Sequence, residues 1–339
     1  MFVNPGFSDK GFWKAVSETM QAAATVLGFD LTIVSGDRKW PVMVARGLAA
    51  LEEVKPDYAI LVNEHQQAPQ LMEAAEAAGI KSILLLNGLT PEQEASMRGP
   101  RQKLSHWLGT ITPDNEIAGY EMAKSLVKAG AALGLDKDGL SVLTLAGDFK
   151  TPASIIRLRG MDRALVEFKH VSEARRITVN WSSDEAYERT TIFLKTANVN
   201  AIWAANDPIA IGAIKALREA GRRPGRDVAV AGLNWSPEAI DLVRRGEMTL
   251  THGGHFLAGA WVMVLLYDYE NGRDFAELST HLSFPMSAIH VGNAEAYMDA
   301  FGDGDWSRID FKRFSRADNP NLGNYPFNLT TLLASRRGY

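Results

Sequence analysis

The sequence has 339 residues, more than one hydrophobic core usually serves, so two lobes are expected. Its net charge of −4, with acidic and basic residues interspersed and no basic stripe, argues against a nucleic-acid partner. The absence of cysteine excludes disulfides, thiolate catalysis and zinc–sulfur sites, and the longest apolar runs are too short to cross a bilayer.

The first residues predict a short opening strand, because Met1-Phe2-Val3 leads directly into Asn4-Pro5-Gly6. No basic region or apolar leader precedes this strand. We therefore expect a mature or trimmed form of an exported protein. A cytosolic protein that opens on a short strand is the alternative.

Apolar strand patterns alternate with amphipathic helix patterns over most of the chain. Strands separated by helix-length crossovers predict parallel sheets with helices on both faces. Gly28, Gly79, Gly130 and Gly221 are each expected to close a helix as a left-handed C′ residue. The expected strands cover 29–34, 58–62, 82–86, 141–146, 177–180, 201–205 and 228–233; the expected helices cover 12–27, 42–53, 69–78, 115–131, 154–167, 184–196, 208–220 and 237–245.

The composition changes over 88–103, which is rich in Glu, Gln, Arg, Gly and Pro, and the first passage between lobes is expected after it. The helix pattern over 256–269 predicts a return to the first lobe, and 282–290 predicts a third crossing. The tail from Val291 is polar and irregular, so we expect it to wrap over the surface. The predicted N-terminal lobe comprises 1–111 and 255–283, and the predicted C-terminal lobe comprises 112–254 and 284–339 with the tail.

The most informative junction is the apolar strand over 201–205 followed by Asn206-Asp207-Pro208. Asp207 before a proline predicts a helix start in which the carboxylate accepts from free backbone N–H groups. Asn206 then lies at the carboxyl end of a strand, where open α/β sheets bind their ligands. Both residues are candidates for ligand binding.

The first strand-to-helix junction carries a polar and aromatic set. Phe12 and Trp13 can lay a ring against a flat apolar face such as that of a sugar, while Ser8 and Lys10 can supply hydrogen bonds. We expect one aromatic residue to pack in the core and one to line a cleft, and Trp13 is the better cleft candidate.

Further candidates follow other predicted strands. Asn87 offers an amide suited to hydroxyl recognition, and equally suits a turn. Arg157 and Arg159 cannot share a helix face, so one is expected to point into the cleft, and Arg159 is favoured.

Two tryptophans come at the ends of predicted strands. Trp181 is either a stacking platform or a cover for the sheet edge, and Asn234-Trp235 repeats the combination of polar and aromatic residues. His252 and His255 flank two glycines where the chain is expected to leave the second lobe. The glycines favour a hinge over a metal site, with His255 as a ligand contact.

No phosphate-binding or dinucleotide-binding fingerprint, nucleophile elbow or His-Glu-x-x-His motif occurs in the sequence. The junctions hold amides, aromatic rings and arginine, which suits binding better than bond-making. We therefore expect no catalytic residue, no metal and no cofactor, and predict that the protein is not an enzyme.

Taken together, these motifs resemble those of the type I periplasmic binding proteins, the ribose-binding-like group, from Phe2 to about His290. The matching motifs, in order, are Phe12-Trp13, Arg159-Gly160, Ala205-Asn206-Asp207, Val230-Ala-Gly-Leu-Asn234 and Arg245-Gly246-Glu247-Met-Thr-Leu. The resemblance implies an α/β fold of two doubly wound parallel-sheet lobes joined by a three-strand hinge.

Within that family, three features are similar to the autoinducer-binding quorum-sensing receptors. They are Pro5-Gly6 with Trp13, Asn87 followed by Thr90-Pro91, and the tail 311–319. Carried over by position, this resemblance implies a ligand set of Ser8, Lys10, Trp13, Asn87, Arg159, Asn206 and Asp207.

The implied function is that of an exported, monomeric, periplasmic solute-binding protein. It would capture a small polar ligand, a sugar or sugar-like molecule, by hinge closure and present it to an ABC transporter permease. The alternatives are a ligand sensor that docks on a membrane histidine kinase, a LacI-type effector domain without its DNA-binding part, and a Rossmann-type enzyme, which the missing fingerprint disfavours.

Overall fold

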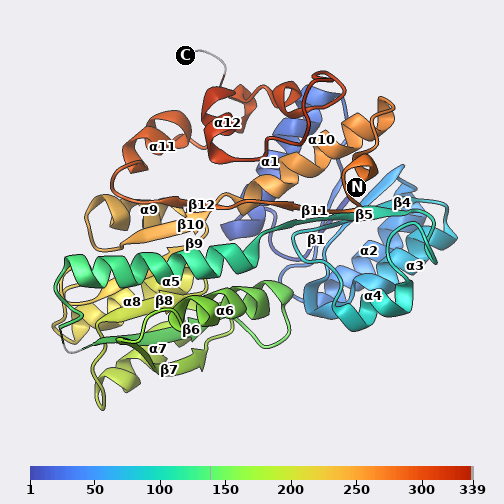
Figure 1. The fold of residues 1–339 in the computed structure, drawn as a ribbon. Coiled ribbons are helices and arrows are strands. Elements are labelled where there is room, and N and C mark those ends of the chain that lie inside the picture. Colours follow the sequence, from blue (N-terminus) through green and yellow to red (C-terminus); the bar gives the residue numbers. More distant parts are fainter. Residues whose placement is uncertain (138, 337–339) are drawn as a thin grey trace. The chain divides into compact units, whose positions relative to one another are not determined.

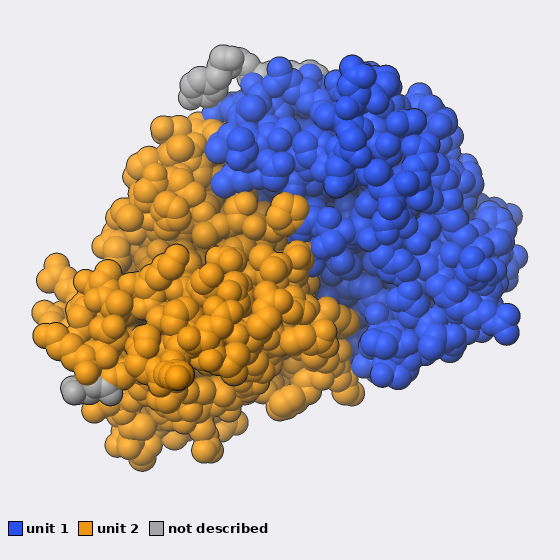
Figure 2. Space-filling model, in the orientation of Figure 1, with its two compact units in different colours: residues 1–113, 255–284, 304–339 blue, residues 114–254, 285–303 orange. Residues whose placement is uncertain are grey.

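The computed structural model describes residues 1–137 and 139–336, and the chain divides into two compact units (Figure 1). Unit 1 comprises Met1–Pro113, His255–Phe284 and Gly304–Tyr339, and unit 2 comprises Asp114–Gly254 and Pro285–Asp303. Figure 2 colours the two units separately. The final three residues of the predicted C-terminal lobe, 337–339, lie outside the described residues.

Unit 1 contains a six-stranded, wholly parallel sheet in the order β11-β5-β4-β3-β1-β2. Helices α1 and α10 pack together over one face, and α2 and α3 pack together over the other (Figure 1). The strands are β1 (Phe2–Asn4), β2 (Ile33–Ser35), β3 (Tyr58–Leu61), β4 (Lys81–Leu85), β5 (Trp107–Pro113) and β11 (His281–Phe284). The helices are α1 (Gly11–Leu27), α2 (Trp40–Val54), α3 (Ala68–Ala77), α4 (Pro91–Met97), α10 (Ala258–Glu270) and α12 (Leu329–Ala334), with 3-10 turns η1 (Glu64–Gln66), η2 (His255–Leu257), η3 (Phe275–Glu277), η4 (Trp306–Arg308) and η5 (Phe311–Phe314).

Unit 2 contains a second six-stranded sheet in the order β12-β10-β9-β8-β6-β7, in which only the β10–β12 pair is antiparallel. Helices α5 and α6 pair with each other, as do α7 and α8. The strands are β6 (Leu140–Ala146), β7 (Val171–Thr178), β8 (Ala201–Ala204), β9 (Ala229–Leu233), β10 (Leu250–Gly253) and β12 (Ser287–Ile289). The helices are α5 (Asn115–Ala132), α6 (Pro152–Leu165), α7 (Ser183–Leu194), α8 (Asp207–Glu219), α9 (Pro237–Arg244) and α11 (Ala294–Phe301).

The predicted α/β architecture of two doubly wound lobes is confirmed. In each sheet the strand order reverses once, between β1 and β3 in unit 1 and between β6 and β8 in unit 2. The crevice outside the carboxyl ends of strands at such a reversal is where doubly wound sheets bind ligands. None of the helices in the described ranges has the length and apolarity that a membrane span requires.

From Gly304 onward the tail lies in unit 1, although we expected all of it in the C-terminal lobe; residues 291–303 lie in unit 2. The chain passes between units four times rather than three, with the last passage after Asp303. Trp261 of α10 stacks against Phe327 at a centroid distance of 4.6 Å and an interplanar angle of 10°, and Phe314 packs beside it at 4.6 Å. Burial of these aromatic rings against α10 therefore holds the tail on unit 1, although most of the residues around them are polar.

A buried carboxylate fixes the same segment. Asp268 of α10 accepts hydrogen bonds from Ser315 Oγ at 2.5 Å and from the backbone N–H of Arg316 at 2.7 Å. The tail is thus an integral part of unit 1.

Candidate functional site

In each unit, most of the polar and aromatic residues singled out from the sequence lie at or beyond the carboxyl ends of the strands.

Arg157 is the most deeply buried cation at this edge of unit 2. Its Nε donates to Asn115 Oδ1 at 2.8 Å, and its Nη1 donates to the carbonyl oxygen of Ala205 at 2.9 Å. Burial lowers the pKa of Arg157 to about 9, and the carboxylate of Asp207 opposes that shift. A pKa near 9 leaves the guanidinium charged at neutral pH.

The prediction that Arg159 points into the cleft is wrong. The Arg159 side chain is 66% exposed, with Nη1 3.9 Å from a carboxylate oxygen of Glu116, whereas Arg157 is buried. Two residues along a helix turn the side chain by about 200°. Because α6 buries the face that carries Gly160 and Met161, Arg157 is the residue turned inward.

Asn206, rather than Asp207, caps α8. Asn206 Oδ1 accepts from the backbone N–H of Ile209 at 3.0 Å. Its amide nitrogen donates to no atom of the residues that the structure describes, so it can donate to a ligand.

Asp207 links three junctions of unit 2. Its carboxylate accepts from the Ser236 N–H at 2.8 Å, the Ser236 hydroxyl at 2.9 Å and Thr251 Oγ1 at 2.7 Å. Burial raises the pKa of Asp207 to about 6, although these hydrogen bonds and Arg157 act in the opposite direction. With both oxygens engaged inside the protein, Asp207 holds the site together instead of facing a ligand.

Two junctions of unit 2 share the sequence Asn-Trp-Ser, at 180–182 and 234–236. Both tryptophans have positive φ values, 61° for Trp181 and 58° for Trp235, and both serines cap the following helix. A bulky residue in this region of backbone space is uncommon and occurs where the surroundings fix it.

The Trp181 ring covers Gly147, where an added Cβ would lie 2.3 Å from the indole. Its Nε1 donates to Asp148 Oδ2 at 2.6 Å, and the Arg157 guanidinium carbon lies 5.8 Å from its ring centroid. Although burial opposes it, the hydrogen bonds from Thr151, Trp181 and Lys150 hold the pKa of Asp148 below its ordinary value. The half-buried Trp181 ring is therefore held in one orientation beside a cation.

Trp235 packs inside unit 2. It is 4% exposed, donates from Nε1 to the carbonyl oxygen of Ser287 at 2.9 Å, and lies edge-on to Tyr297 with ring centroids 5.2 Å apart. Gly253 and Gly254 pass directly under its ring. Of the two tryptophans, Trp181 has the accessibility that a stacking platform needs.

Asn234 and His252 also lie near the carboxyl ends of the unit 2 strands. Asn234 is half-buried, and its side-chain amide bonds to none of the described residues. Burial lowers the pKa of His252 to about 4, with a further contribution from the charge of Arg157, so His252 is neutral at pH 7.

In unit 1, Phe12 and Trp13 occupy positions opposite to those expected. Trp13 is 8% exposed and covers Gly6, whereas Phe12 is half-buried and stacks on His255 with centroids 4.5 Å apart and planes at 23°. The accessible aromatic ring of this junction is that of Phe12, and His255 supports it.

The remaining unit 1 candidates differ in burial. Asn87 is 6% exposed, and its side chain bonds to no residue in the described part of the chain. Ser8 and Lys10 are exposed, and Lys10 Nζ lies 4.2 Å from the centroid of the Phe7 ring.

Three further residues at these edges were not predicted. Asn115 holds Arg157, and Asp148 holds Trp181. The third residue, the buried Glu64, lies 3.5 Å from Arg38. Asp148 follows a buried strand by two residues, and this signal could have identified it. Asn115 directly follows Asp114, which caps α5, so a helix-start pattern by itself accounts for this stretch of sequence.

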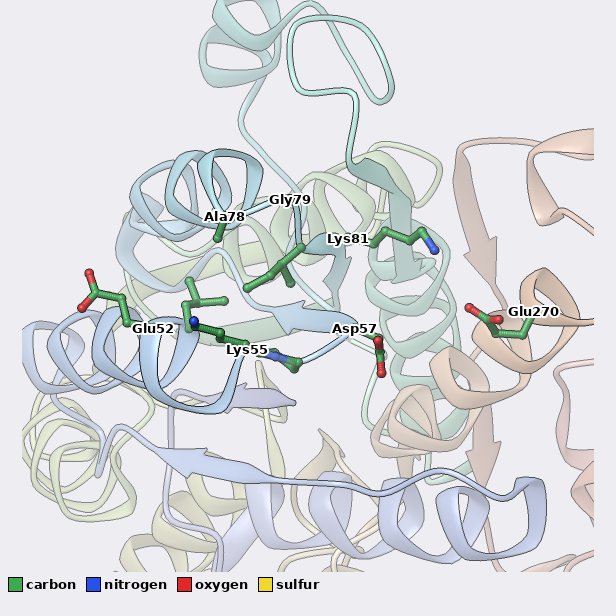
Figure 3. A pocket seen from close by; sticks show the side chains of 10 residues that line it. Glu52, Lys55, Asp57, Ala78, Gly79, Lys81 and Glu270 are labelled. Carbon is green, nitrogen blue, oxygen red and sulfur yellow. The ribbon is translucent and has the colours of Figure 1, made fainter.

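Over residues 1–137 and 139–336, no cluster of three or more His, Asp or Glu residues could hold a metal ion. A surface pocket of about 630 Å³ lies elsewhere in unit 1, at the amino ends of β3 and β4 (Figure 3). Figure 3 shows Lys55 and Lys81 among the carboxylates Glu52, Asp57 and Glu270. Positively and negatively charged side chains are mixed in this pocket. The unit 1 residues singled out from the sequence lie at the opposite, carboxyl ends of the strands.

A protein-family model described as "Periplasmic binding protein domain" matches residues 1–274. The chain belongs to this family. Among solved structures, a periplasmic sugar-binding protein from Pseudomonas fluorescens is similar, with 34% identity, a TM-score of 0.87 and coverage of 98% of both chains. That match therefore extends over most of the tail, which the family model leaves out.

Curated relatives of this periplasmic binding protein include two import proteins. The D-apiose import binding protein of Paraburkholderia graminis is 25% identical over 254 residues, 72% of each chain. The ribose import binding protein of Salmonella typhimurium is 25% identical over 251 residues, 71% of this chain and 74% of its own. These names give no support to the narrower resemblance to autoinducer receptors.

Proposed function

We propose that this periplasmic binding protein captures a monosaccharide or a similarly small polyol and delivers it to an ABC transporter. The observation that carries the proposal is a group of three residues at the carboxyl ends of the unit 2 strands. Arg157 offers a cation, Trp181 offers an accessible ring, and Asn206 offers a free amide donor.

This set suits a sugar for a chemical reason. The faces of a sugar ring that carry C–H groups pack against aromatic surfaces, while its hydroxyls both donate and accept. The indole of Trp181 provides the flat apolar surface. Arg157 donates, and the amides of Asn206 and Asn234 both donate and accept, so each hydroxyl orientation finds a partner.

Unit 1 supplies a second, smaller set. Asn87 offers an amide and Phe12 an aromatic ring supported by His255. We propose that this set also contributes to ligand recognition, and that the ligand stabilises the conformation for which it has the higher affinity. Ser8, Lys10 and Arg159 are too exposed to be central to the binding site in this proposal.

The named relatives support a small sugar as the ligand class. Their names specify D-apiose and ribose. We propose a pentose-sized ligand, periplasmic capture of that ligand, and a membrane permease as partner.

A calorimetric screen tests the proposal with D-apiose, D-ribose, L-arabinose, D-allose, xylitol and myo-inositol. At least one of these is expected to bind and to raise the melting temperature. Arg157→Ala should weaken binding by about 100-fold, since it removes a buried charged donor. Arg159→Ala, a matched change two residues away, should leave the affinity unchanged. Equal affinities for both variants and the parent protein would contradict the assignment of the site.

A ligand sensor for a membrane histidine kinase is a second candidate. The observation that favours it is the tail, part of which carries the resemblance to autoinducer receptors and which is fixed on α10. A borate-linked autoinducer included in the same screen would distinguish the two candidates.

A further inference from the structure

Helices α5 and α6 cross at two glycines that allow their backbones to touch. A Cβ atom added to Gly160 of α6 would lie 1.9 Å from the carbonyl oxygen of Glu116, and one added to Gly119 of α5 would lie 2.0 Å from the carbonyl oxygen of Arg157. Both obstacles are backbone atoms, which cannot rotate aside as a side chain can. The separation of the two helices therefore depends on both glycines.

This crossing brings Asn115 and Arg157 together. Asn115 is one helical turn before Gly119, and Arg157 is three residues before Gly160, so both side chains leave their helices beside the contact. The resulting bond from Arg157 Nε to Asn115 Oδ1 is 2.8 Å long. A larger helix separation would lengthen this bond directly.

We propose that Asn115 is the positioning residue of the binding arginine, fixing the direction of the Arg157 guanidinium through this crossing. The proposal rests on the proposed function, in which Arg157 contacts the sugar. Arginine has a long, flexible side chain, and a ligand that had to order it would bind more weakly. With Nε held by Asn115 and Nη1 held by Ala205, the guanidinium is already oriented before the ligand arrives.

Helix capping does not account for the Asn115 side chain. The start of α5 is capped by Asp114, whose Oδ1 accepts from the Ile117 N–H at 3.0 Å. Asn115 is 5% exposed, and its Oδ1 accepts from Arg157 on a different helix. Removing that oxygen would deprive a buried donor of its partner.

The first experiment needs no ligand. In protein with ¹⁵N-labelled arginine, the Nε–H signal of Arg157 is assigned by its loss in Arg157→Lys, and its exchange with water is measured. Asn115→Ala should accelerate that exchange by about tenfold or more, because the hydrogen-bond acceptor is gone. Asn115→Asp keeps an acceptor oxygen and should preserve the slow exchange.

The glycines are tested by the same signal. Gly160→Ala should accelerate exchange as Asn115→Ala does. Gly130→Ala is the matched control within α5, because the added Cβ there meets the movable Leu140 side chain at 2.6 Å instead of backbone. If Gly160→Ala does not fold, the Asn115 variants still decide the proposal. Unchanged exchange in Asn115→Ala overturns it.

The second experiment is a double-mutant cycle, with D-apiose and D-ribose as the titrated sugars. Asn115→Ala should lower affinity about tenfold in the parent protein and less than about twofold in Arg157→Lys, since Asn115 acts through Arg157. Fully additive effects would mean that Asn115 contributes independently, which overturns the proposal. If instead Arg157→Lys binds as tightly as the parent protein, the proposed function fails at this residue, while the exchange measurement still decides the positioning.

Discussion

Asp207 makes the stability of this protein depend on pH in a direction opposite to that of most carboxylates. Burial raises its pKa from 3.8 to about 6, so the folded protein holds the proton more tightly than the unfolded chain does. The contribution of this group to stability is therefore complete below about pH 4 and is lost as the pH rises through 6. The two pKa values differ by an amount that corresponds to about 3 kcal/mol.

The perturbation that isolates this effect is Asp207→Asn. The amide keeps an oxygen that can accept from Ser236, and its NH₂ can donate to Thr251 Oγ1 after the threonine hydroxyl rotates. Urea unfolding of parent and variant is measured at pH values from 4 to 8. Relative to the variant, the parent should lose about 3 kcal/mol over this range, because only the parent must bury a charge at the higher pH.

Titrating groups that do not interact with Asp207 are shared by both proteins and cancel in the difference. Asp207→Ala is the control for the hydrogen bonds, and it should cost about 3 kcal/mol or more at every pH, because it leaves buried donors without an acceptor. Parallel pH profiles for the parent and Asp207→Asn would refute the reasoning.

Three further changes have expected outcomes. Trp235→Ala should destabilise unit 2 by about 3–5 kcal/mol in calorimetric melting. Trp181→Ala should instead lower sugar affinity with a smaller effect on the melting temperature, and equal losses of stability in the two variants would contradict this distinction. Asp268→Ala should cost about 3 kcal/mol in urea unfolding, because it leaves buried tail donors unpaired, and an unchanged midpoint would show that the tail is not fixed there. Gly6→Ala should destabilise unit 1 by about 1–3 kcal/mol and change the tryptophan fluorescence, because the new Cβ would lie 2.1 Å from Trp13; an unaltered emission spectrum would contradict that contact.

The architecture was predictable because it depends on local periodicity. Buried parallel strands are continuous apolar runs, and the helices between them have amphipathic spacing. The apolar pattern missed β5 and β10, and at β7, which lies at a sheet edge and exposes Glu173, Arg175 and Arg176, only the end was recognised as a strand. Edge strands commonly carry charges, which hide them from an apolar pattern.

The orientation of particular side chains was not predictable to the same degree. The sequence placed two arginines on α6 and two aromatic residues at the start of α1, and in both pairs the favoured member was the wrong one. Helix periodicity predicts that the two side chains of each pair point in different directions. Only packing against the sheet decides which of the two points inward.

Glycines illustrate the same limit. Gly28, Gly79 and Gly221 have positive φ values of 81°, 70° and 73° and follow helices, as predicted. Gly130 lies inside α5, where an added Cβ would meet Leu140. A glycine required for close packing and a glycine that ends a helix look alike in a single sequence.

The division of the chain also constrains the order in which its parts can be completed. Unit 2 has all of its segments once residue 303 has been made, whereas unit 1 needs residues from Gly304 onward to cover Trp261. The first strand of the chain thus belongs to the unit that is completed last. During synthesis, the apolar surface of α10 stays uncovered until the tail has been made, so the unfinished form of unit 1 is the one most exposed to aggregation and most in need of protection.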